Sequence, residues 1–173
     1  MGGLREIVAA YDILVRALSV LAGVIVGVDC LLIVIDVTVR TLGVPPPAYT
    51  IAVVEYSLLY VAMFAAPHLV RIKGHVFINA LIARLPRRLE IALAKIVYVI
   101  SIASSLVYAW YSLDLLIEAI NTGIYDERGV DMPLWSLYLP IPIGFLLVAI
   151  EFARFLFGSD LMHRGQTEAE GSV

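Results

Sequence analysis

Long apolar runs separated by short polar stretches dominate the chain. Four of these runs reach the length of about 20 residues that a helix needs to cross a hydrocarbon core of roughly 30 Å. Because lipid offers no partner to backbone N–H and C=O groups, each run is predicted to be a helix rather than a strand. The runs cover residues 17–39, 51–70, about 91–116 and about 134–157, and we expect an amphipathic turn or two from Leu4 to extend the first helix. The pattern therefore predicts an all-α integral membrane protein with four spanning helices.

The breaks between the runs agree with one four-span membrane domain over residues 1–160. Pro45 opens a run of three prolines that cannot continue the first helix. Pro140 and Pro142 lie inside the fourth run and predict a kink there, or a late start of its regular part. The remaining residues, 161–173, are polar without a periodic apolar face, which predicts a flexible tail.

A basic stretch follows the second run directly and leads into a shorter apolar-faced segment. Arg71 and His75 fall within five residues, and residues 75–85 are then mostly apolar with few polar positions. This composition predicts a helix lying at the membrane interface between spans two and three; a re-entrant piece packed on a partner is the alternative. The predicted basic anchors of this segment are Arg84, Arg87 and Arg88.

Composition excludes a water-soluble protein. Of the 173 residues, 61% are hydrophobic and 16% charged, and the mean hydropathy is +0.94, whereas soluble domains average about 45–50% apolar and about 25% charged. A chain of this size could not hide so much apolar surface from water. We therefore expect membrane lipids around it and no nucleic-acid partner. The single cysteine, Cys30, cannot form an intramolecular disulfide.

The distribution of Lys and Arg predicts the orientation. Of the 12 Lys and Arg residues, only Arg40 and Arg128 fall in the first and third loops, which leaves ten for the termini and the second loop. Because basic loops remain in the cytoplasm, both termini and the second loop are predicted to be cytoplasmic. Trp135 falls where an outer aromatic belt is expected.

Asp29 is the ionisable residue nearest the middle of the first run. An ionisable group at that depth costs about 2.5–3.5 kcal/mol, so Asp29 should face protein or water rather than acyl chains. It could be a proton or sodium site, but a buried polar contact that holds this helix to another subunit is the preferred hypothesis. Gly23 and Gly27 form a G-x-x-x-G pair that allows a neighbouring helix to approach closely.

Charged residues near the outer boundary predict a structural network. Asp36 and Arg40 are four residues apart on one helical face, which favours a simple ion pair. Glu55 begins the second run close to Arg40 and could complete a network of the three. We expect structural use of these residues rather than catalysis.

No catalytic or cofactor-binding pattern is evident. His68 and His75 are seven residues apart, so a continuous helix would point them the same way, which disfavours bis-histidine haem ligation. The sequence has no Cys/His cluster typical of zinc, no phosphate-binding glycine loop and no Ser/His/Asp set. We therefore expect no cofactor, no metal and no enzymatic activity.

A combination of motifs resembles a known family. Arg40-x-x-Gly43-x-Pro45, then Glu55, then Arg71-x-x-x-His75-Val-x-Ile-x-x-Leu and Leu85-Pro86 is similar to the small membrane subunit of tripartite ATP-independent periplasmic (TRAP) transporters. Asn79 stands where that family commonly has an acidic residue. We predict interface or structural roles for the small and charged residues discussed above, and for Arg71, His75, Asn79 and Pro86.

The resemblance implies a secondary uptake system of the bacterial or archaeal inner membrane. Such a system pairs the small subunit with a large integral-membrane subunit and an extracytoplasmic solute-binding protein. It takes up mostly carboxylates, driven by a sodium gradient rather than ATP. The large subunit would hold the substrate and sodium sites, and this chain would be a fixed scaffold. Two alternatives remain: a small proton-coupled exporter acting as a homodimer through Asp29, and a haem-binding membrane anchor.

Overall fold

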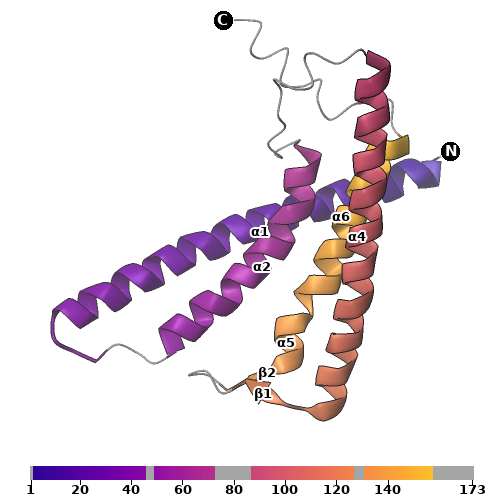
Figure 1. The fold of residues 1–173 in the computed structure, drawn as a ribbon. Helices are drawn as coiled ribbons and strands as arrows, with labels where there is room; N and C mark the ends of the chain where they lie inside the picture. The colour runs from indigo at the N-terminus through magenta and orange to yellow at the C-terminus, as the bar shows by residue number, and fades with distance from the viewer. Residues whose placement is uncertain (1, 46–48, 73–86, 127–130, 158–173) are drawn as a thin grey trace, which may run out of the picture.

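The computed structural model describes residues 2–45, 49–72, 87–126 and 131–157 (Figure 1). Four of its helices are long and apolar enough to cross a membrane, which confirms the predicted all-α four-span fold. The elements are α1 (Gly2–Thr41), α2 (Tyr49–Arg71), α4 (Arg87–Thr122), the two-residue strands β1 (Tyr125–Asp126) and β2 (Met132–Pro133), α5 (Leu134–Tyr138) and α6 (Pro140–Phe157). The predicted interfacial helix at residues 75–85 and the tail at residues 161–173 lie outside the described residues.

Two helices are longer than the apolar runs that predicted them. α1 begins at Gly2, well before residue 17, and α4 runs from Arg87 to Thr122 rather than over residues 91–116. At about 1.5 Å per residue, the 40 residues of α1 measure roughly 60 Å, about twice the thickness of a hydrocarbon core. Hydrophobicity locates only the part of a helix that lies in lipid, so the length of α4 was underestimated, whereas the extension of α1 was expected from Leu4.

A glycine with positive φ ends α1. Gly43 has φ 78°, a left-handed conformation that glycine adopts without steric cost. Its N–H donates to the carbonyl of Arg40, and the N–H of Val44 donates to the carbonyl of Val39, at 3.2 Å each. This is the Schellman arrangement that satisfies the last carbonyls of a helix, and Pro45 follows it.

The fourth run is divided, as its prolines predict. α5 ends at Tyr138 and α6 begins at Pro140, which has no N–H to continue the earlier helix. The β1–β2 hairpin before α5 is not predicted by the sequence; it pairs Tyr125 with Pro133 and Asp126 with Met132. Because such short strands carry no alternating pattern, periodicity could not reveal them.

The long helices pack in the order α1, α2, α6, α4. The extensive contacts join α1 to α2, α2 to α6 and α6 to α4, while α5 packs on α4 and α6. Figure 1 shows α1 running obliquely to α4 and α6. Helices α1 and α4 are therefore the two edge helices, and each has one principal neighbour.

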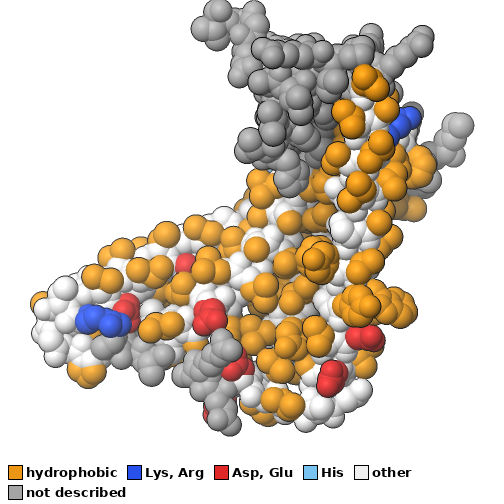
Figure 2. Space-filling model, viewed as in Figure 1, with side chains coloured by type: hydrophobic (Ala, Val, Ile, Leu, Met, Phe, Trp, Pro, Cys, Tyr) orange, Lys and Arg blue, Asp and Glu red, His pale blue; other side chains and the backbone are white. Residues whose placement is uncertain are grey.

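Each edge helix buries a single narrow stripe. Buried positions recur at intervals of seven residues on both helices, the spacing of a coiled-coil seam. They are Val15, Ala22, Asp29 and Asp36 on α1, and Tyr98, Ser105, Ser112 and Ala119 on α4, where Ala94 and Leu116 are also buried. The other sides of both helices expose large apolar side chains, and Figure 2 shows hydrophobic side chains covering much of the visible surface. Such a surface requires lipid or another protein around it.

Helices α2 and α6 approach each other most closely at Gly144. A Cβ added to Gly144 would lie 2.8 Å from Met63 Cβ and 3.0 Å from the Met63 carbonyl oxygen. Pro67, four residues after Met63, has no N–H to donate to that carbonyl. Gly144 therefore allows α6 to pack directly on the backbone of α2.

An apolar core lies beside the end of α2. Val70, Ala94, Tyr98 and Phe152 are buried together there, joining α2, α4 and α6. The Tyr98 ring centroid lies 6.3 Å from that of Phe152. The core adjoins Arg71 and Glu151, the next residue on α2 and the preceding residue on α6. It therefore holds in place the helix segments that carry these two charges.

Candidate functional site

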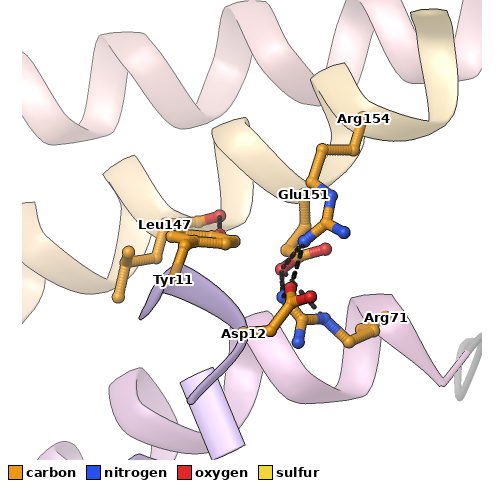
Figure 3. A network of polar contacts seen from close by, with 6 residues as sticks. All are labelled: Tyr11, Asp12, Arg71, Leu147, Glu151 and Arg154. Atoms are coloured by element: carbon orange, nitrogen blue, oxygen red, sulfur yellow. Dashed lines mark hydrogen bonds and ion pairs between the residues drawn. The ribbon is translucent and has the colours of Figure 1, made fainter. Parts of the chain in front are cut away.

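The main polar site joins α1, α2 and α6 near the N-terminal end of α1. It consists of Tyr11, Asp12, Arg71, Glu151 and Arg154, which we call the charged cluster (Figure 3). The cluster holds two carboxylates and two guanidinium groups, so its formal charges cancel. It brings together residues from three helices that are far apart in the sequence.

Arg71 is the bridge of the charged cluster. From α2, its Nε donates to Oε1 of Glu151 on α6 at 3.1 Å, and its Nη2 donates to the same oxygen. The same Nη2 lies 3.0 Å from Oδ1 of Asp12 on α1. The Glu151 side chain is only 2% exposed. A buried carboxylate of this kind is tolerated only when it is paired and hydrogen-bonded. Arg71 therefore provides the pairing that allows Glu151 to be buried.

Arg154 and Tyr11 complete the charged cluster. Arg154 Nη1 lies 2.8 Å from Asp12 Oδ1 and 3.6 Å from Glu151 Oε1. The guanidinium carbons of Arg71 and Arg154 each lie 5.6 Å from the centroid of the Tyr11 ring, within the range of cation–π attraction. The Tyr11 hydroxyl donates to the Leu147 carbonyl at 3.4 Å, a long hydrogen bond. α1 is thus attached to α6 by ionic, aromatic and polar contacts.

The sequence reveals only one member of the charged cluster as a site residue. Arg71 is predicted as part of a basic stretch beside the membrane, whereas the structure pairs it with Glu151. A signal for Glu151 was present, because it is the one acidic residue in the fourth run. The sequence does not show that Tyr11 and Asp12 of α1 reach the same place.

Asp29 has its partner in its own chain. It is 5% exposed, and both of its carboxylate oxygens lie 2.8 Å from Ser57 Oγ on α2. Ser57 Oγ also lies 2.9 Å from the Val54 carbonyl oxygen in α2. Asp29 was expected to contact another subunit, or to form an ion site. In the structure its contact joins α1 to α2 instead.

Asp36 and Arg40 form an ion pair four residues apart, with Arg40 Nη2 3.1 Å from Asp36 Oδ2. The Arg40 side chain is 59% exposed, whereas that of Asp36 is only 12% exposed, so the pair lies at the edge of the buried seam. Asp36 Oδ1 is buried without a hydrogen-bond partner among the described residues. Glu55 is exposed on α2 and lines the same groove as Asp36.

Two tyrosines attach α2 to the hairpin region, and the sequence does not reveal them. The Tyr56 hydroxyl donates to Asp126 Oδ2 at 2.9 Å. The Tyr60 hydroxyl donates to the carbonyl of Ser136 in α5. Together with the charged cluster, these contacts connect α2 to other elements at both of its ends.

The remaining predicted site residues make few contacts or are not described. Gly23 and Gly27 lie on an exposed side of α1, and an added Cβ would meet nothing within 4 Å at either position. Trp135 lies in α5 and is 41% exposed. Arg87 and Arg88 lie in the first turn of α4, where side chains are not described. The predicted residues His75, Asn79, Arg84 and Pro86 lie outside the described part of the chain.

The arrangement offers no metal-binding group of three or more acidic, His or Cys side chains within the described residues. The acidic side chains of the charged cluster are occupied by arginines of the same chain. His68, in α2, has a buried Nδ1 with no partner among the described residues, and the other candidate haem ligand, His75, is not described.

These observations define a helical integral membrane protein whose described buried charges mainly join its own helices. A family model described as "Tripartite ATP-independent periplasmic transporters, DctQ component" matches residues 29–160. The chain belongs to this family and is a small membrane subunit of a TRAP transporter, a multi-pass protein of the cytoplasmic membrane. Membership implies association with a large membrane subunit and a solute-binding protein. Comparison with curated proteins finds no match.

Proposed function

We propose that this subunit is a non-catalytic scaffold for the large transport subunit of a sodium-coupled system that takes up organic acids. The family membership supports the transporter role. The organic-acid substrates and the sodium coupling come from the resemblance of the sequence motifs to that family. On this proposal both termini are cytoplasmic, so the charged cluster lies on the cytoplasmic side and the hairpin faces the solute-binding protein.

The charged cluster is the observation that supports a scaffold. Asp12 and Glu151 are each bound by arginines of the same chain, so neither carboxylate is left free to take part in solute or ion binding. The contacts join α1, α2 and α6, and moving any of these helices would expose a charge. A buried charge without its partner is costly, which favours one fixed arrangement of the three helices.

The structure disfavours one of the two alternatives, and the sequence disfavours the other. A homodimeric exporter would use Asp29 at the interface between two copies, but Asp29 faces Ser57 of its own chain. The haem hypothesis needs two histidines on opposite sides of the ring, and the sequence spacing of His68 and His75 already disfavours it.

Reconstitution tests the proposal. Vesicles containing this chain with the large subunit, supplied with the solute-binding protein, should accumulate a carboxylate when a sodium gradient is imposed. Vesicles containing this chain alone should accumulate none. Uptake by the lone chain, or failure of the chain to co-purify with the large subunit, would refute the scaffold.

Alanine variants test which residues matter. We expect alanine at Glu55, Arg71 or His75 to reduce assembly or uptake more than alanine at Asp160 or Glu168 in the polar C-terminal segment. Equal tolerance at all five positions would contradict the predicted roles. Recovery of each variant from membranes, measured without the large subunit, separates loss of assembly from loss of the chain itself.

A further inference from the structure

One side of α1 has no partner within the described residues. Helix α1 buries 11% of its most apolar stretch, compared with 33% in the span Leu134–Phe157. The side facing away from the buried seam carries large exposed apolar residues, including Val20 at 62% and Leu31 at 64% exposed. The positions on this outer face of α1 are separated by three or four residues; they are Ile13, Arg16, Val20, Gly23, Gly27 and Leu31.

Two glycines, Gly23 and Gly27, leave a notch without side chains in the middle of the outer face. Gly23 and Gly27 are both exposed, and an added Cβ would meet no atom of another described helix within 4 Å. Packing within the chain therefore does not require glycine at either position, in contrast to Gly144, where a Cβ would collide with Met63. Two glycines four residues apart allow another helix in the membrane to approach the backbone.

Toward the N-terminus the same face is hollowed and carries a cation. A groove of about 710 Å³ is lined there by α1 residues that include Ala9, Ile13, Ala17 and Val20. Asp12 and Arg16 also line this groove; Asp12 is paired with Arg71 and Arg154, whereas Arg16 is exposed, with no hydrogen bond or ion pair to a described residue. A groove of this kind could accept apolar side chains, and Arg16 would favour an acidic group beside them.

The outer face of α1 also lacks the residues typical of lipid contact at membrane interfaces. No Trp, Tyr or Phe occurs between Tyr11 and Tyr49. The other edge helix, α4, carries Tyr108, Trp110 and Tyr111, each at least 60% exposed. Trp and Tyr are enriched where a helix meets lipid headgroups, so Trp110 and Tyr111 favour lipid contact on α4, whereas Tyr108 stacks on Phe145 of α6.

We propose that the outer face of α1 binds a membrane-spanning helix of the large subunit. Small or apolar residues of that helix pack against Gly23 and Gly27, and an acidic side chain of the large subunit pairs with Arg16. The inference rests on the proposed scaffold function, and it specifies which surface of the scaffold is used.

Bulky substitutions at the notch test this surface. In a chain carrying Gly23→Leu and Gly27→Leu, recovery with a tagged large subunit should fall about tenfold or more, because the added side chains occupy the space of the partner helix. Ala103→Leu, at an exposed position on α4, is the matched control and should leave recovery within about twofold. Without the large subunit, helicity and elution of the glycine variant should match those of the unsubstituted chain, since both positions are exposed and a Cβ added there meets no neighbouring described residue within 4 Å.

Photo-crosslinking identifies the occupant. A photoreactive residue at Val20 or Leu31 should link to the large subunit, and one at Val107 on α4 should not. Links only to lipid or only to a second copy of this chain would overturn the docking surface, as would full recovery of the large subunit by the glycine variant. These results leave the scaffold function standing. That function fails instead if the unsubstituted chain recovers no large subunit.

Discussion

Breaking the bridge of the charged cluster should destabilise the chain strongly. Arg71→Met removes both hydrogen bonds to Glu151 Oε1 and, among the described residues, leaves that carboxylate with Arg154 at 3.6 Å and the Tyr11 hydroxyl. The Glu151 side chain is 2% exposed, so water cannot replace the lost partner. Removing one member of a buried ion pair costs about 3–5 kcal/mol. Because Arg154 remains nearby, we expect a loss near the lower limit, about 3 kcal/mol in the free energy of unfolding.

Substituting the other member of the pair should lower the free energy of unfolding by less. Glu151→Leu leaves Arg71 25% exposed and within 3.0 Å of Asp12, so this cation keeps one partner and some water. We expect a loss of about 2 kcal/mol. In the double variant neither charge is left unpaired at this position, so the combined loss should fall short of the sum by at least about 1.5 kcal/mol.

The Asp36–Arg40 ion pair is the comparison. Arg40→Met breaks an ion pair of similar length, 3.1 Å, but the Arg40 side chain is 59% exposed and that of Asp36 is 12% exposed, compared with 2% for Glu151, so the substitution should cost less than Arg71→Met, about 1 kcal/mol. The free energy of unfolding of all variants can be measured by denaturant titration in detergent micelles, followed by circular dichroism. Additive losses at Arg71 and Glu151, or an equal loss at Arg40, would refute the conclusion that the charged cluster holds the helices together.

Three further substitutions, two of them with a control substitution, can be measured in the same assay. Gly144→Ala should lower the free energy of unfolding by about 1–3 kcal/mol because its Cβ would collide with Met63. Gly23→Ala is the control and should leave it unchanged, since its Cβ meets no neighbouring described residue. Equal effects of the two substitutions would contradict the close approach of α6 to α2. Ser57→Ala removes the hydrogen-bond partner of the buried Asp29 and should cost about 1–3 kcal/mol, whereas Ser104→Ala, at an exposed serine bonded to its own helix, should cost below about 0.5 kcal/mol. Gly43→Ala forces a side chain into positive φ and should cost about 1–2 kcal/mol; an unchanged value would show that the turn can relax.

Local features of the fold were predictable from the sequence. The four spans follow from composition and run length, and the break before Pro140 follows from proline chemistry. The Asp36–Arg40 pair could be predicted because residues four apart on a helix are neighbours whatever the tertiary fold. Each of these features depends only on residues close together in the chain.

Features that depend on the order of helices were not predictable. Arg71 and Glu151 are 80 residues apart, and nothing in the sequence indicates that α2 packs on α6. Asp29 was identified as a buried polar contact, but Ser57 was not, because a serine in a helix commonly bonds its own backbone and carries no distinct signal. The same applies to the Tyr56 contact with Asp126.

The distribution of polar groups explains why the helices keep a fixed order in lipid. An apolar seam gains little in a membrane, since acyl chains are as apolar as leucine, and helices associate there through close packing and hydrogen bonds. In this chain, the polar contacts that join helices are Asp29 with Ser57, between α1 and α2, and the charged cluster, which joins α1, α2 and α6. Asp36 and Ser112 are buried as well, but they bond within their own helices. The outer sides of the edge helices are apolar, the reverse of a soluble coiled coil. Polar contacts therefore specify the neighbours within the chain, and close packing at the glycines of α1 remains available to a partner.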